Sequence, residues 1–462
     1  MNQYIQETAK SIPVVKETDV VVAGGGLSGV IAAYAAAKSG AKTMLVERFS
    51  CLGGVAVMGL PIQGYESSEG VQIVKGFAKE FHERLAKIGG APQKLTPCRM
   101  HNAFLPVLPE AVKLVCQEML LDAGVTVWLN TVASDVVMNG DHISALIVEG
   151  KSGRQAIRAK EFIDCTGDAD IALKSGAPFQ IADDADLMAN TLDIIFCGVD
   201  KERLRSCMMQ EREKYDVVEL YPREQIAEND YFIINGFKNQ IRQAAEEKEM
   251  FASLSGQICL VTLPKDDMVC VNSVHVSGFS PCESGALSEI EMRTRTQAQL
   301  LARFVQEYLP GFEKASVATT APWAGIRESR RITGVKTLSM ENIANGEIPE
   351  DTVALGGYPY DFHRKNVDDG KENTEFYKVP VYGIPYGCLV TEKVDNLFVA
   401  GKTISATREA MASSRVMAQC MAEGHAAGIA AAMCAKSGDR AEDVDVHTLR
   451  QKLSEQGAVL NV

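Results

Sequence analysis

Three glycines and one glutamate near the start of the chain have types and spacing that suit contact with phosphate and sugar groups. Gly24, Gly26 and Gly29 form G-x-G-x-x-G directly after the apolar run 20–23. The first glycine permits a tight turn, the second lets the backbone approach a pyrophosphate, and the third lets a helix pack closely on a strand. Glu47 follows 23 residues (47 − 24) after the first glycine, where a carboxylate can accept hydrogen bonds from both ribose hydroxyl groups of an adenosine.

A strand, a turn, a helix and a second strand are needed to place these residues. The run 20–23 is typical of a strand buried on both faces, and the alanine-rich segment 27–39 is typical of a helix that lies on a sheet. Gly40 can end this helix, and the run 43–46 then forms the second strand. The start of the helix offers unpaired N–H groups and its positive dipole end to phosphates. The order of these elements predicts dinucleotide binding, with a purely structural βαβ turn as the alternative.

The composition limits the class of protein. A chain of 462 residues can form two or three domains. The net charge of −13 argues against nucleic-acid binding, which needs basic patches, but it leaves room for a local cationic pocket. No apolar run reaches the roughly 18 residues of a membrane span, and the segment 1–17 has no apolar signal core. The absence of such segments predicts no membrane association. The 12 cysteines include no C-x-x-C pair, so we expect free thiols in a cytoplasmic location and no metal site.

The residues after Glu47 indicate which dinucleotide is bound. Arg48 comes next, and Gly53 and Gly54 follow after a short gap. This segment resembles the FAD-dependent oxidoreductases with a glutathione-reductase-like FAD domain, in which an E-(R/K)…GG segment runs from the ribose back under the FAD phosphates. A flexible Gly-Gly loop is the alternative. Residues 55–57 hold neither the cysteine pair of disulfide reductases nor the flavin-linked histidine of succinate-dehydrogenase-like proteins, so the resemblance implies non-covalent FAD and no disulfide relay.

A second motif follows the segment 161–165, which is expected to form a buried strand. Thr166, Gly167 and Asp168 resemble the strand-(A/C)TG element that closes the dinucleotide domain of FAD-binding folds. In that element the glycine passes near the adenosine or the pyrophosphate. A bare T-G-D is an ordinary turn, but its position after the first unit favours contact with the cofactor.

The C-terminal part of the chain returns to the same domain in this resemblance. The run 397–400 is typical of a buried strand, and it ends at Gly401, which the family places near the ribityl-phosphate region. A helix rich in small residues is expected over 414–434. Its start, with Val416, would lie at the N1/O2 edge of the flavin, where negative charge develops on reduction.

Three arginines lie close together in the segment 323–334. Arg327, Arg330 and Arg331 flank Glu328, and neighbouring apolar residues indicate partial burial. A solvated basic turn is the alternative. Buried guanidinium groups need carboxylate or phosphate partners, which are either internal, such as Glu328, or part of an anionic substrate.

Two loops rich in tyrosine, proline and glycine, 355–364 and 381–388, are typical of segments that cover an active site, although they also occur as plain packing. They supply His363 and Tyr386 as candidates for proton transfer. Arg415 lies at the expected start of the late helix, where fumarate-reductase-like relatives place an arginine that binds a substrate carboxylate. Contact with a phosphate or a surface carboxylate is the alternative for Arg415.

The pattern R-E-S-R-R…Y-x-I-P-Y…N-L-x-V-A-G-K…S-x-R-V-M resembles the bacterial FAD-dependent oxidoreductase family. The resemblance covers residues 19–180 and 265–435. It implies an α/β fold in which a Rossmann-like FAD domain of the glutathione-reductase type is built from both ends of the chain, with a mixed-sheet substrate domain inserted. The expected ranges are 1–180 and 386–440 for the FAD domain, 181–385 for the substrate domain and 441–462 for a C-terminal packing helix.

The implied function is hydride transfer between flavin N5 and a small polar or anionic organic substrate. Arg330, Arg331 and Arg415 would orient the substrate, and His363 or Tyr386 would move a proton. Oxidation of a CH–OH or CH–NH centre and reduction of an activated C=C both stay open, as does the oligomeric state. Because there is no second G-x-G-x-x-G unit, electrons would pass through substrates exchanged at one site or through a separate carrier. The alternative is a flavin-containing electron-transfer subunit of a larger redox complex.

Overall fold

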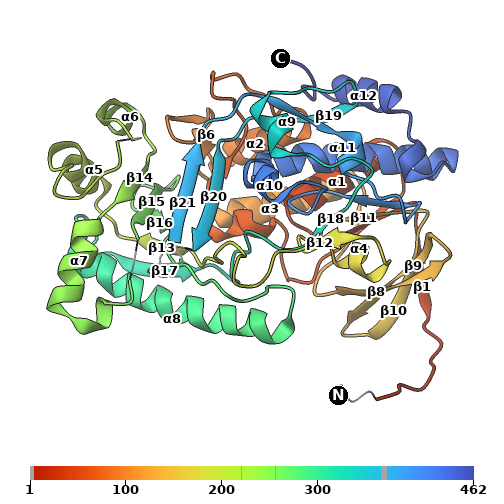
Figure 1. Ribbon diagram of the computed structural model, residues 1–462, viewed down its shortest axis with the longest axis horizontal. Coiled ribbons are helices and arrows are strands. Elements are labelled where there is room, and N and C mark those ends of the chain that lie inside the picture. Colours follow the sequence, from red (N-terminus) through yellow and green to blue (C-terminus); the bar gives the residue numbers. More distant parts are fainter. Residues whose placement is uncertain (1–4, 220, 255, 366–371) are drawn as a thin grey trace.

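A five-stranded parallel sheet organises one half of the molecule, and its strands come from both ends of the chain (Figure 1). The computed structural model describes residues 5–219, 221–254, 256–365 and 372–462. The strands of this sheet are β2 (Val20–Ala23), β3 (Thr43–Val46), β7 (Thr126–Trp128), β11 (Glu161–Asp164) and β23 (Leu397–Val399). They lie in the order β7–β3–β2–β11–β23, and every pairing is parallel. The predicted strands at 20–23 and 43–46 are confirmed.

Two helices from opposite ends of the chain cross in backbone contact. They are α1 (Leu27–Lys38) and α11 (Met417–Ser437), which lie side by side in Figure 1. A Cβ atom added at Gly424 would lie 2.2 Å from the carbonyl oxygen of Ser28, and one added at Gly428 would lie 2.2 Å from that of Ala32. The small residues of α11 are therefore required by the short distance between the helices.

The helix expected over 414–434 is wrong at its start. A separate helix, α10 (Arg408–Ser414), ends where Arg415 forms its C-cap, and α11 begins only at Met417. Between them Val416 has extended backbone angles, with φ −75° and ψ 153°. The thiol of Cys420 donates to the carbonyl oxygen of Arg415 at 3.2 Å and so helps to hold the break.

A mixed four-stranded sheet and further helices complete this half. The sheet has the order β1–β10–β9–β8, and β1 pairs with β10 in parallel whereas the other pairs are antiparallel. A two-residue turn, Gly140-Asp141, joins β8 to β9, because Asn139 pairs with His142 across it. The bounds are β1 (Val14–Glu17), β8 (Val132–Asn139), β9 (His142–Gly150), β10 (Gly153–Arg158), α2 (Phe77–Lys87), α3 (Pro109–Asp122), α4 (Asp170–Lys174) and α12 (Val446–Glu455).

The second half is built on an antiparallel sheet with its own hydrophobic core. Its strands are β13 (Ile194–Cys197), β14 (Ile233–Gly236), β15 (Ile258–Thr262), β16 (Val269–Val271) and β17 (Ser316–Thr320), in the order β14–β15–β16–β13–β17. All four pairings are antiparallel, so the predicted mixed sheet is wrong here. The short connection between β15 and β16 permits only an antiparallel pair.

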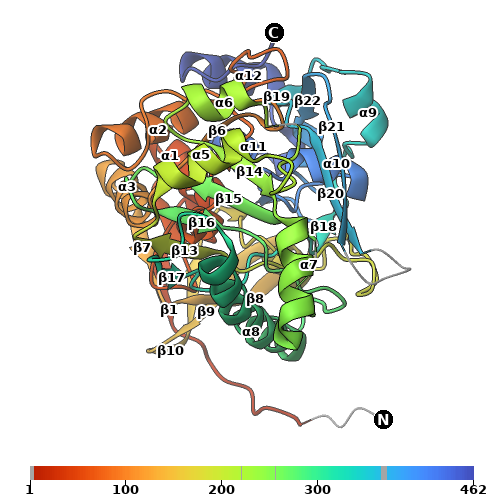
Figure 2. The same cartoon turned by 90° about the vertical axis from the view of Figure 1, so that its left-hand side faces the viewer.

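Helices surround this second sheet and face the viewer in Figure 2. They are α5 (Lys201–Gln210), α6 (Arg223–Glu228), α7 (Lys238–Glu247) and the long helix α8 (Ser284–Tyr308). The hairpin of β20 (Tyr360–Lys365) and β21 (Glu372–Tyr377) lies between the two halves in Figure 1. Trp323 packs against the hydrophobic cores of both halves.

Smaller elements connect these layers. The short strands are β4 (Ile62–Gln63), β5 (Thr96–Cys98), β6 (Asn102–Leu105), β12 (Phe179–Gln180), β18 (Arg331–Ile332), β19 (Thr352–Gly356) and β22 (Tyr382–Pro385), and the remaining helix is α9 (Met340–Ala344). Single 3-10 turns occur at Gly54–Met58, Glu249–Phe251, Tyr386–Cys388 and Ala441–Asp443. All twelve cysteines are free thiols. Over the described ranges, no helix has the length and apolar character needed to cross a bilayer.

The buried side chain of Glu161, at the start of β11, makes the stability of the folded protein depend on pH. The side chain is 4 % exposed, and its Oε2 atom has no hydrogen-bond partner. Burial, reinforced by the nearby Asp395, raises the pKa of Glu161 to about 9. Because the folded pKa lies above the ordinary value of 4.5, the folded state binds the proton more tightly and loses stability as the pH rises from 4.5 towards 9.

The substitution Glu161→Gln removes this titration. As the pH rises through this window, we expect the unfolding free energy of the variant to increase relative to that of the wild type, by up to about 1.4 kcal/mol per pH unit. Urea unfolding at pH 5, 7 and 9 measures the difference. The exposed Glu149 on β9 provides the control, because Glu149→Gln should shift stability equally at all three pH values. A constant difference between Glu161→Gln and the wild type would contradict the assignment.

Candidate functional site

A cavity of about 830 Å³ lies between the two halves of the molecule. Its wall takes residues from the glycine motif, from the loops that follow β3 and β11, from β14, β15 and β20, and from the start of α11. This volume is near the upper end of the range for small-molecule and cofactor sites. The elements from both ends of the sequence therefore enclose one continuous space.

Most of the predicted cofactor-binding residues line this cavity. They are Gly24, Gly26, Glu47, Arg48, Gly54, Thr166, Gly167, Asp168, Gly401 and Val416. Gly29 and Gly53 lie behind the wall. A Cβ atom added at Gly29 would lie 1.9 Å from the carbonyl oxygen of Gly24, so this glycine is needed for the close packing of helix on strand that the motif predicts. Gly53 has φ +113°, and its N–H donates to the carbonyl oxygen of Gly25 at 2.8 Å.

Glu47 is held in a fixed orientation at the end of β3. Its Oε2 atom accepts a hydrogen bond from the N–H of Gly25 at 2.5 Å, and its Oε1 atom accepts one from the N–H of Phe49 at 2.7 Å. The side chain is only 7 % exposed and lines the cavity. An ionised carboxylate accepts about four hydrogen bonds, so Glu47 keeps acceptor capacity for hydroxyl groups of a ligand.

The loop after β11 is organised by Asp164, which sequence reasoning missed. This fully buried carboxylate accepts hydrogen bonds from the hydroxyl of Thr166 at 2.7 Å and from the backbone N–H groups of Thr166, Ile171 and Ala172. Burial raises its pKa to about 6, although these donors oppose the shift. An acidic residue at the end of an apolar strand was the available signal. Asp164 fixes the turn that carries Gly167 and Asp168.

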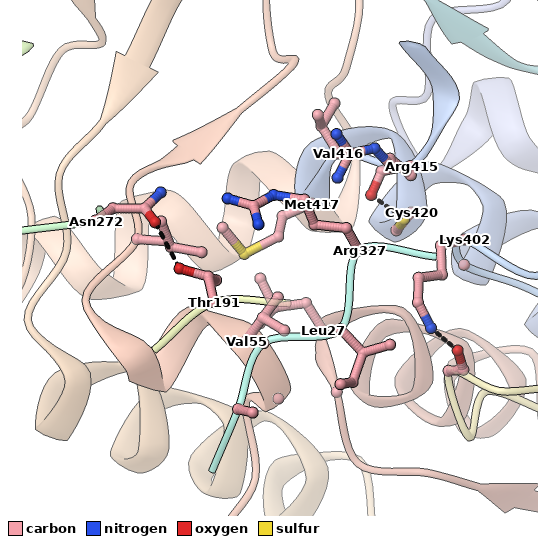
Figure 3. A pocket seen from close by; sticks show the side chains of 18 of the residues that line it. Leu27, Val55, Thr191, Asn272, Arg327, Lys402, Arg415, Val416, Met417 and Cys420 are labelled. Carbon is pink, nitrogen blue, oxygen red and sulfur yellow. Dashed lines mark hydrogen bonds between the residues drawn. The ribbon is translucent and has the colours of Figure 1, made fainter. Parts of the chain in front are cut away.

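Lys402 neutralises the acidic end of the same loop. Its ammonium group contacts Asp168 Oδ1 at 3.1 Å and Ser329 Oγ at 2.9 Å, and it donates to the carbonyl oxygen of Gly167. Burial alone would raise the pKa of Asp168, but Lys402 lowers it below its ordinary value. Figure 3 shows Lys402 beside the cavity. The pair joins the segment after β23 to the segment after β11.

An aromatic stack closes the cavity next to Glu47. The rings of Phe49 and Trp323 lie 3.8 Å apart and are parallel within 3°, and the guanidinium of Arg48 lies 4.8 Å from the centre of the Phe49 ring. All three residues line the cavity. The stack connects the loop after β3 to the arginine-rich segment 323–334.

The residues around the glycine motif fit a dinucleotide. A Cβ atom added at Gly54 would lie 2.8 Å from the Cα atom of Gly26, so the two loops approach as closely as only glycines permit. Helix α1 begins next to Gly26 without a side-chain cap, and α11 begins next to Val416 without one. Both N-termini lie at the cavity wall, where their N–H groups suit phosphate and other electron-rich groups.

At the far end of the cavity, Asp361 joins His363 and Arg415. His363 Nε2 lies 3.1 Å from Asp361 Oδ1, and Arg415 Nη2 lies 3.5 Å from Asp361 Oδ2. Arg415 also donates to the carbonyl oxygen of Asp361 at 2.9 Å. Burial alone would raise the pKa of Asp361, but His363 and Arg415 hold it well below its ordinary value. The structure thus brings together two predicted residues, and an aspartate that was not predicted pairs with both.

Of the three clustered arginines, only Arg327 lines the cavity. Its Nη1 atom donates to the carbonyl oxygen of Ala189 at 2.6 Å, and its Nη2 atom lies 3.5 Å from His275 Nε2. Figure 3 shows its side chain extending beside Met417 in the direction of Asn272. Sequence reasoning named this residue within the cluster but not as a site residue.

Three predicted catalytic residues are not among the residues that line the cavity. Arg330 pairs with Asp170 at 2.9 Å. Arg331 pairs with the fully buried Glu328 at 3.3 Å, the internal partner that the sequence left open. The hydroxyl of Tyr386 donates to the carbonyl oxygen of Ala441 at 2.5 Å inside the core. Each group is satisfied by the protein itself.

A stacked histidine and tyrosine were missed by sequence reasoning. His101 and Tyr358 line the cavity, their rings are parallel within 5°, and His101 Nδ1 lies 3.0 Å from the Tyr358 hydroxyl. That hydroxyl donates to Gln63 Oε1 at 3.0 Å, so His101 is the donor to Tyr358. Burial lowers the pKa of His101 to about 4 and keeps its ring neutral. Tyr358 lies in the predicted loop 355–364, whereas nothing in the sequence marked His101.

Comparison with known proteins gives one family and several distant relatives. The chain matches the FAD dependent oxidoreductase family over residues 19–453. It is 27 % identical over 159 residues to thiamine thiazole synthase from Methanococcus vannielii, a match that covers 33 % of this chain and 56 % of that protein. The chain therefore spans little more than half the length of this relative.

Two solved structures resemble the fold. A geranylgeranyl bacteriochlorophyll reductase-like protein from Thermoplasma acidophilum is 15 % identical, with a TM-score of 0.49 over 96 % of this chain and 84 % of that chain. The p-nitrophenol 4-monooxygenase of Pseudomonas putida is 13 % identical, with a TM-score of 0.46 over 96 % of this chain and 87 % of that chain. No functional role is transferred from either. The family match spans nearly the whole chain, and most of the predicted cofactor-binding residues line the cavity. The protein belongs to the FAD-dependent oxidoreductase family and is an enzyme that uses FAD.

Proposed function

We propose that the protein binds FAD non-covalently in this cavity and transfers a hydride between flavin N5 and a small polar or anionic organic substrate. One observation carries the proposal: a single cavity is lined both by Gly24 and Glu47 of the nucleotide motif and by the charged residues Arg327 and Asp361. The part lined by the motif suits the nucleotide, and the part with the charged residues suits a substrate. FAD supplies the hydride chemistry when bound, and the protein supplies position and charge.

The nucleotide end would hold the cofactor through the groups already described. Glu47 would accept hydrogen bonds from the adenosine ribose, and the N–H groups near Gly26 would donate to the phosphates. The start of α11, with Val416, would place N–H groups at the flavin edge that becomes negative on reduction. Gly401 and Gly167 would let the backbone approach, because both line the cavity and have positive φ angles.

The other end would position the substrate and hold a proton. Asp361 orients the ring of His363, because its carboxylate Oδ1 lies 3.1 Å from Nε2. A histidine oriented by a buried carboxylate is a common arrangement for general acid–base catalysis. His363 would therefore give a proton to the substrate or take one from it. The direction depends on whether the substrate is reduced or oxidised.

The proposal includes the domain organisation and location expected from the sequence. The FAD domain would comprise 1–180 and 386–440, of the glutathione-reductase type, and the substrate domain would comprise 181–385. Parallel pairing of β23 with β11 supports the contribution of both ends of the chain. The separate hydrophobic core of the antiparallel sheet supports the inserted domain. The twelve free thiols support a reducing, cytoplasmic compartment.

The cofactor half of the proposal is tested on the purified protein. We expect a yellow protein that releases intact FAD on heat denaturation, since the segment 55–64, directly after Gly54, has no histidine for a covalent bond. We expect Glu47→Gln to weaken FAD binding about tenfold, because an amide has one acceptor oxygen instead of two and places a donor against a backbone N–H. Fluorescence titration of the apoprotein with FAD measures this. Flavin that stays with the denatured chain would contradict non-covalent binding.

The reaction half is tested by anaerobic spectroscopy. Holoenzyme is mixed with a panel of hydroxy acids, amino acids and unsaturated acids, and loss of the oxidised flavin band identifies a reductant. Recovery of that band in dithionite-reduced enzyme identifies an oxidant. If no member of the panel exchanges electrons with the flavin, while a co-purifying redox protein does, the alternative of an electron-transfer subunit replaces the proposal.

A further inference from the structure

Five cationic side chains line the cavity, and they differ in what already neutralises them. They are Arg48, Lys238, Arg327, Lys402 and Arg415. Lys402 pairs with Asp168, and Arg415 pairs with Asp361. Arg48 lies over Phe49, next to Glu47, at the nucleotide end. Lys238 is exposed at the start of α7, where solvent screens its charge.

Arg327 differs from the other two arginines because it is half-buried and lacks an acidic partner among the residues that the structure describes. Within the described residues, its hydrogen-bonding contacts are the carbonyl oxygen of Ala189 and the Nε2 atom of His275. A guanidinium has five N–H donors, and these two contacts use two of them. Donors therefore remain for a ligand in the cavity.

Glu328 and Asp193 are acidic residues near Arg327, but within the described residues neither forms an ion pair or a hydrogen bond with it. Glu328, its neighbour in the chain, is fully buried and lies against Arg408 at 2.7 Å and Arg331 at 3.3 Å on the opposite side of the segment. Asp193 is fully buried behind the wall, and neither of its carboxylate oxygens has a hydrogen-bond partner. Burial raises the pKa of Asp193 to about 7, and the positive charge of Arg327 opposes this rise.

The cavity wall near Arg327 also includes Asn272, which adds a second hydrogen-bond donor. Asn272 Oδ1 accepts a hydrogen bond from the hydroxyl of Thr191 at 2.9 Å, and both residues line the cavity (Figure 3). Because the amide oxygen is used in this way, the Asn272 amide N–H₂ group is the part that can donate to a ligand. A guanidinium and an amide together suit a planar acceptor with a single negative charge.

We propose that the substrate carries a carboxylate and that Arg327 binds it, with Asn272 as the second donor. This inference rests on the proposed function and names the substrate class. One carboxylate balances one guanidinium, whereas a phosphate dianion would leave uncompensated charge in a half-buried site. Arg415, which the resemblance had suggested for this role, already has its charge neutralised by Asp361.

The test compares matched acids and amides on the holoenzyme. Wild-type protein with its FAD content measured is titrated with benzoate and benzamide, and with butyrate and butyramide, and the change of the oxidised-flavin spectrum gives each Kd. We expect each acid to bind at least about tenfold more tightly than its amide, the usual size of a charge-assisted hydrogen bond. Inorganic phosphate should bind more weakly than either acid.

Variants then locate the preference. Arg327→Gln should weaken acid binding at least about tenfold and leave amide binding within about twofold, and Arg327→Lys should keep part of the preference. Arg415→Lys should retain the preference for acids, since the positive charge at position 415 pairs with Asp361. Arg303→Gln, an exposed position on α8, is the matched control and should behave like the wild type.

The outcomes separate the two proposals. A holoenzyme that binds acids no better than amides overturns the carboxylate assignment and leaves the FAD function standing. If Arg327→Gln still binds acids more tightly than amides while Arg415→Lys, with equal FAD content, does not, the carboxylate binds at Arg415. That result also overturns the inference. A chain that holds no FAD contradicts the proposed function itself, before any acid is added.

Discussion

Replacing Gly29 with alanine is expected to abolish FAD binding and to lower the unfolding free energy by about 3 kcal/mol or more. The new Cβ atom would lie 1.9 Å from the carbonyl oxygen of Gly24 and 3.0 Å from its carbonyl carbon. Backbone atoms cannot move aside as a flexible side chain does, so α1 must shift away from β2. The N–H groups at the start of α1 then no longer face the phosphates. Urea unfolding and FAD titration measure the two effects.

Gly285 on α8 provides the matched control. A Cβ atom added there meets nothing within 4 Å, and the residue is exposed in a regular helix. Gly285→Ala should therefore leave FAD binding unchanged and stabilise the protein by at most about 1 kcal/mol. If Gly29→Ala binds FAD as tightly as this control, the close packing of α1 on the glycine turn is not what forms the site.

Glu328→Gln is expected to lower the unfolding free energy by about 3–5 kcal/mol. The carboxylate of Glu328 is fully buried and accepts hydrogen bonds from Arg408 at 2.7 Å and 3.0 Å, from Arg331 at 3.3 Å and from the N–H of Met188 at 3.0 Å. Removal of the charge leaves two guanidinium groups close together with no nearby carboxylate between them. Chemical denaturation of the apoprotein and of the holoenzyme measures the loss.

A surface pair calibrates this result. Glu289 and Arg293 lie one turn apart on α8 with N···O 2.6 Å, but their side chains are 46 % and 56 % exposed. Glu289→Gln should cost less than about 1 kcal/mol because solvent screens the pair. Equal costs for the two substitutions would show that the buried carboxylate does not hold the arginine segment in place. A large cost at Glu328 alone would show that it fixes the segment from which Arg327 extends.

Local patterns were enough to predict the nucleotide end of the site. The turn at Gly24, the helix after it and the carboxylate of Glu47 are separated by few residues, and their geometry follows from the backbone freedom of glycine and from the apolar period. The late strand ending at Gly401 was also predictable, because its apolar run and the glycine that follows lie side by side in the sequence.

The substrate end could not be predicted in the same way. Arg327, Arg330 and Arg331 have the same chemistry, and only tertiary contacts decide which one reaches the cavity. Arg330 pairs with Asp170 on α4, and Arg331 pairs with Glu328. Arg327 is therefore the arginine of this cluster that reaches the cavity. Neither partner can be assigned from spacing alone, because Asp170 lies 160 residues earlier in the chain.

The break between α10 and α11 was missed for a related reason. No proline or glycine marks Arg415 or Val416, and both types occur inside ordinary helices. The extended backbone of Val416 is stabilised from outside, since Arg415 is tied to Asp361 on the neighbouring hairpin. The pair Ser413-Ser414 was the available signal, as serine pairs often accompany sharp bends.

The crossing of α1 with α11 has a consequence for synthesis of the protein on the ribosome. Strand β23 and helix α11 begin at Leu397 and Met417, so their places beside β11 and α1 stay vacant until most of the polypeptide has been translated. The apolar surfaces of the early strand and helix are exposed to solvent during that interval, which favours aggregation and chaperone capture. Nascent chains truncated before residue 397 would accumulate as insoluble, colourless material, and FAD would be bound only after β23 and α11 have been translated.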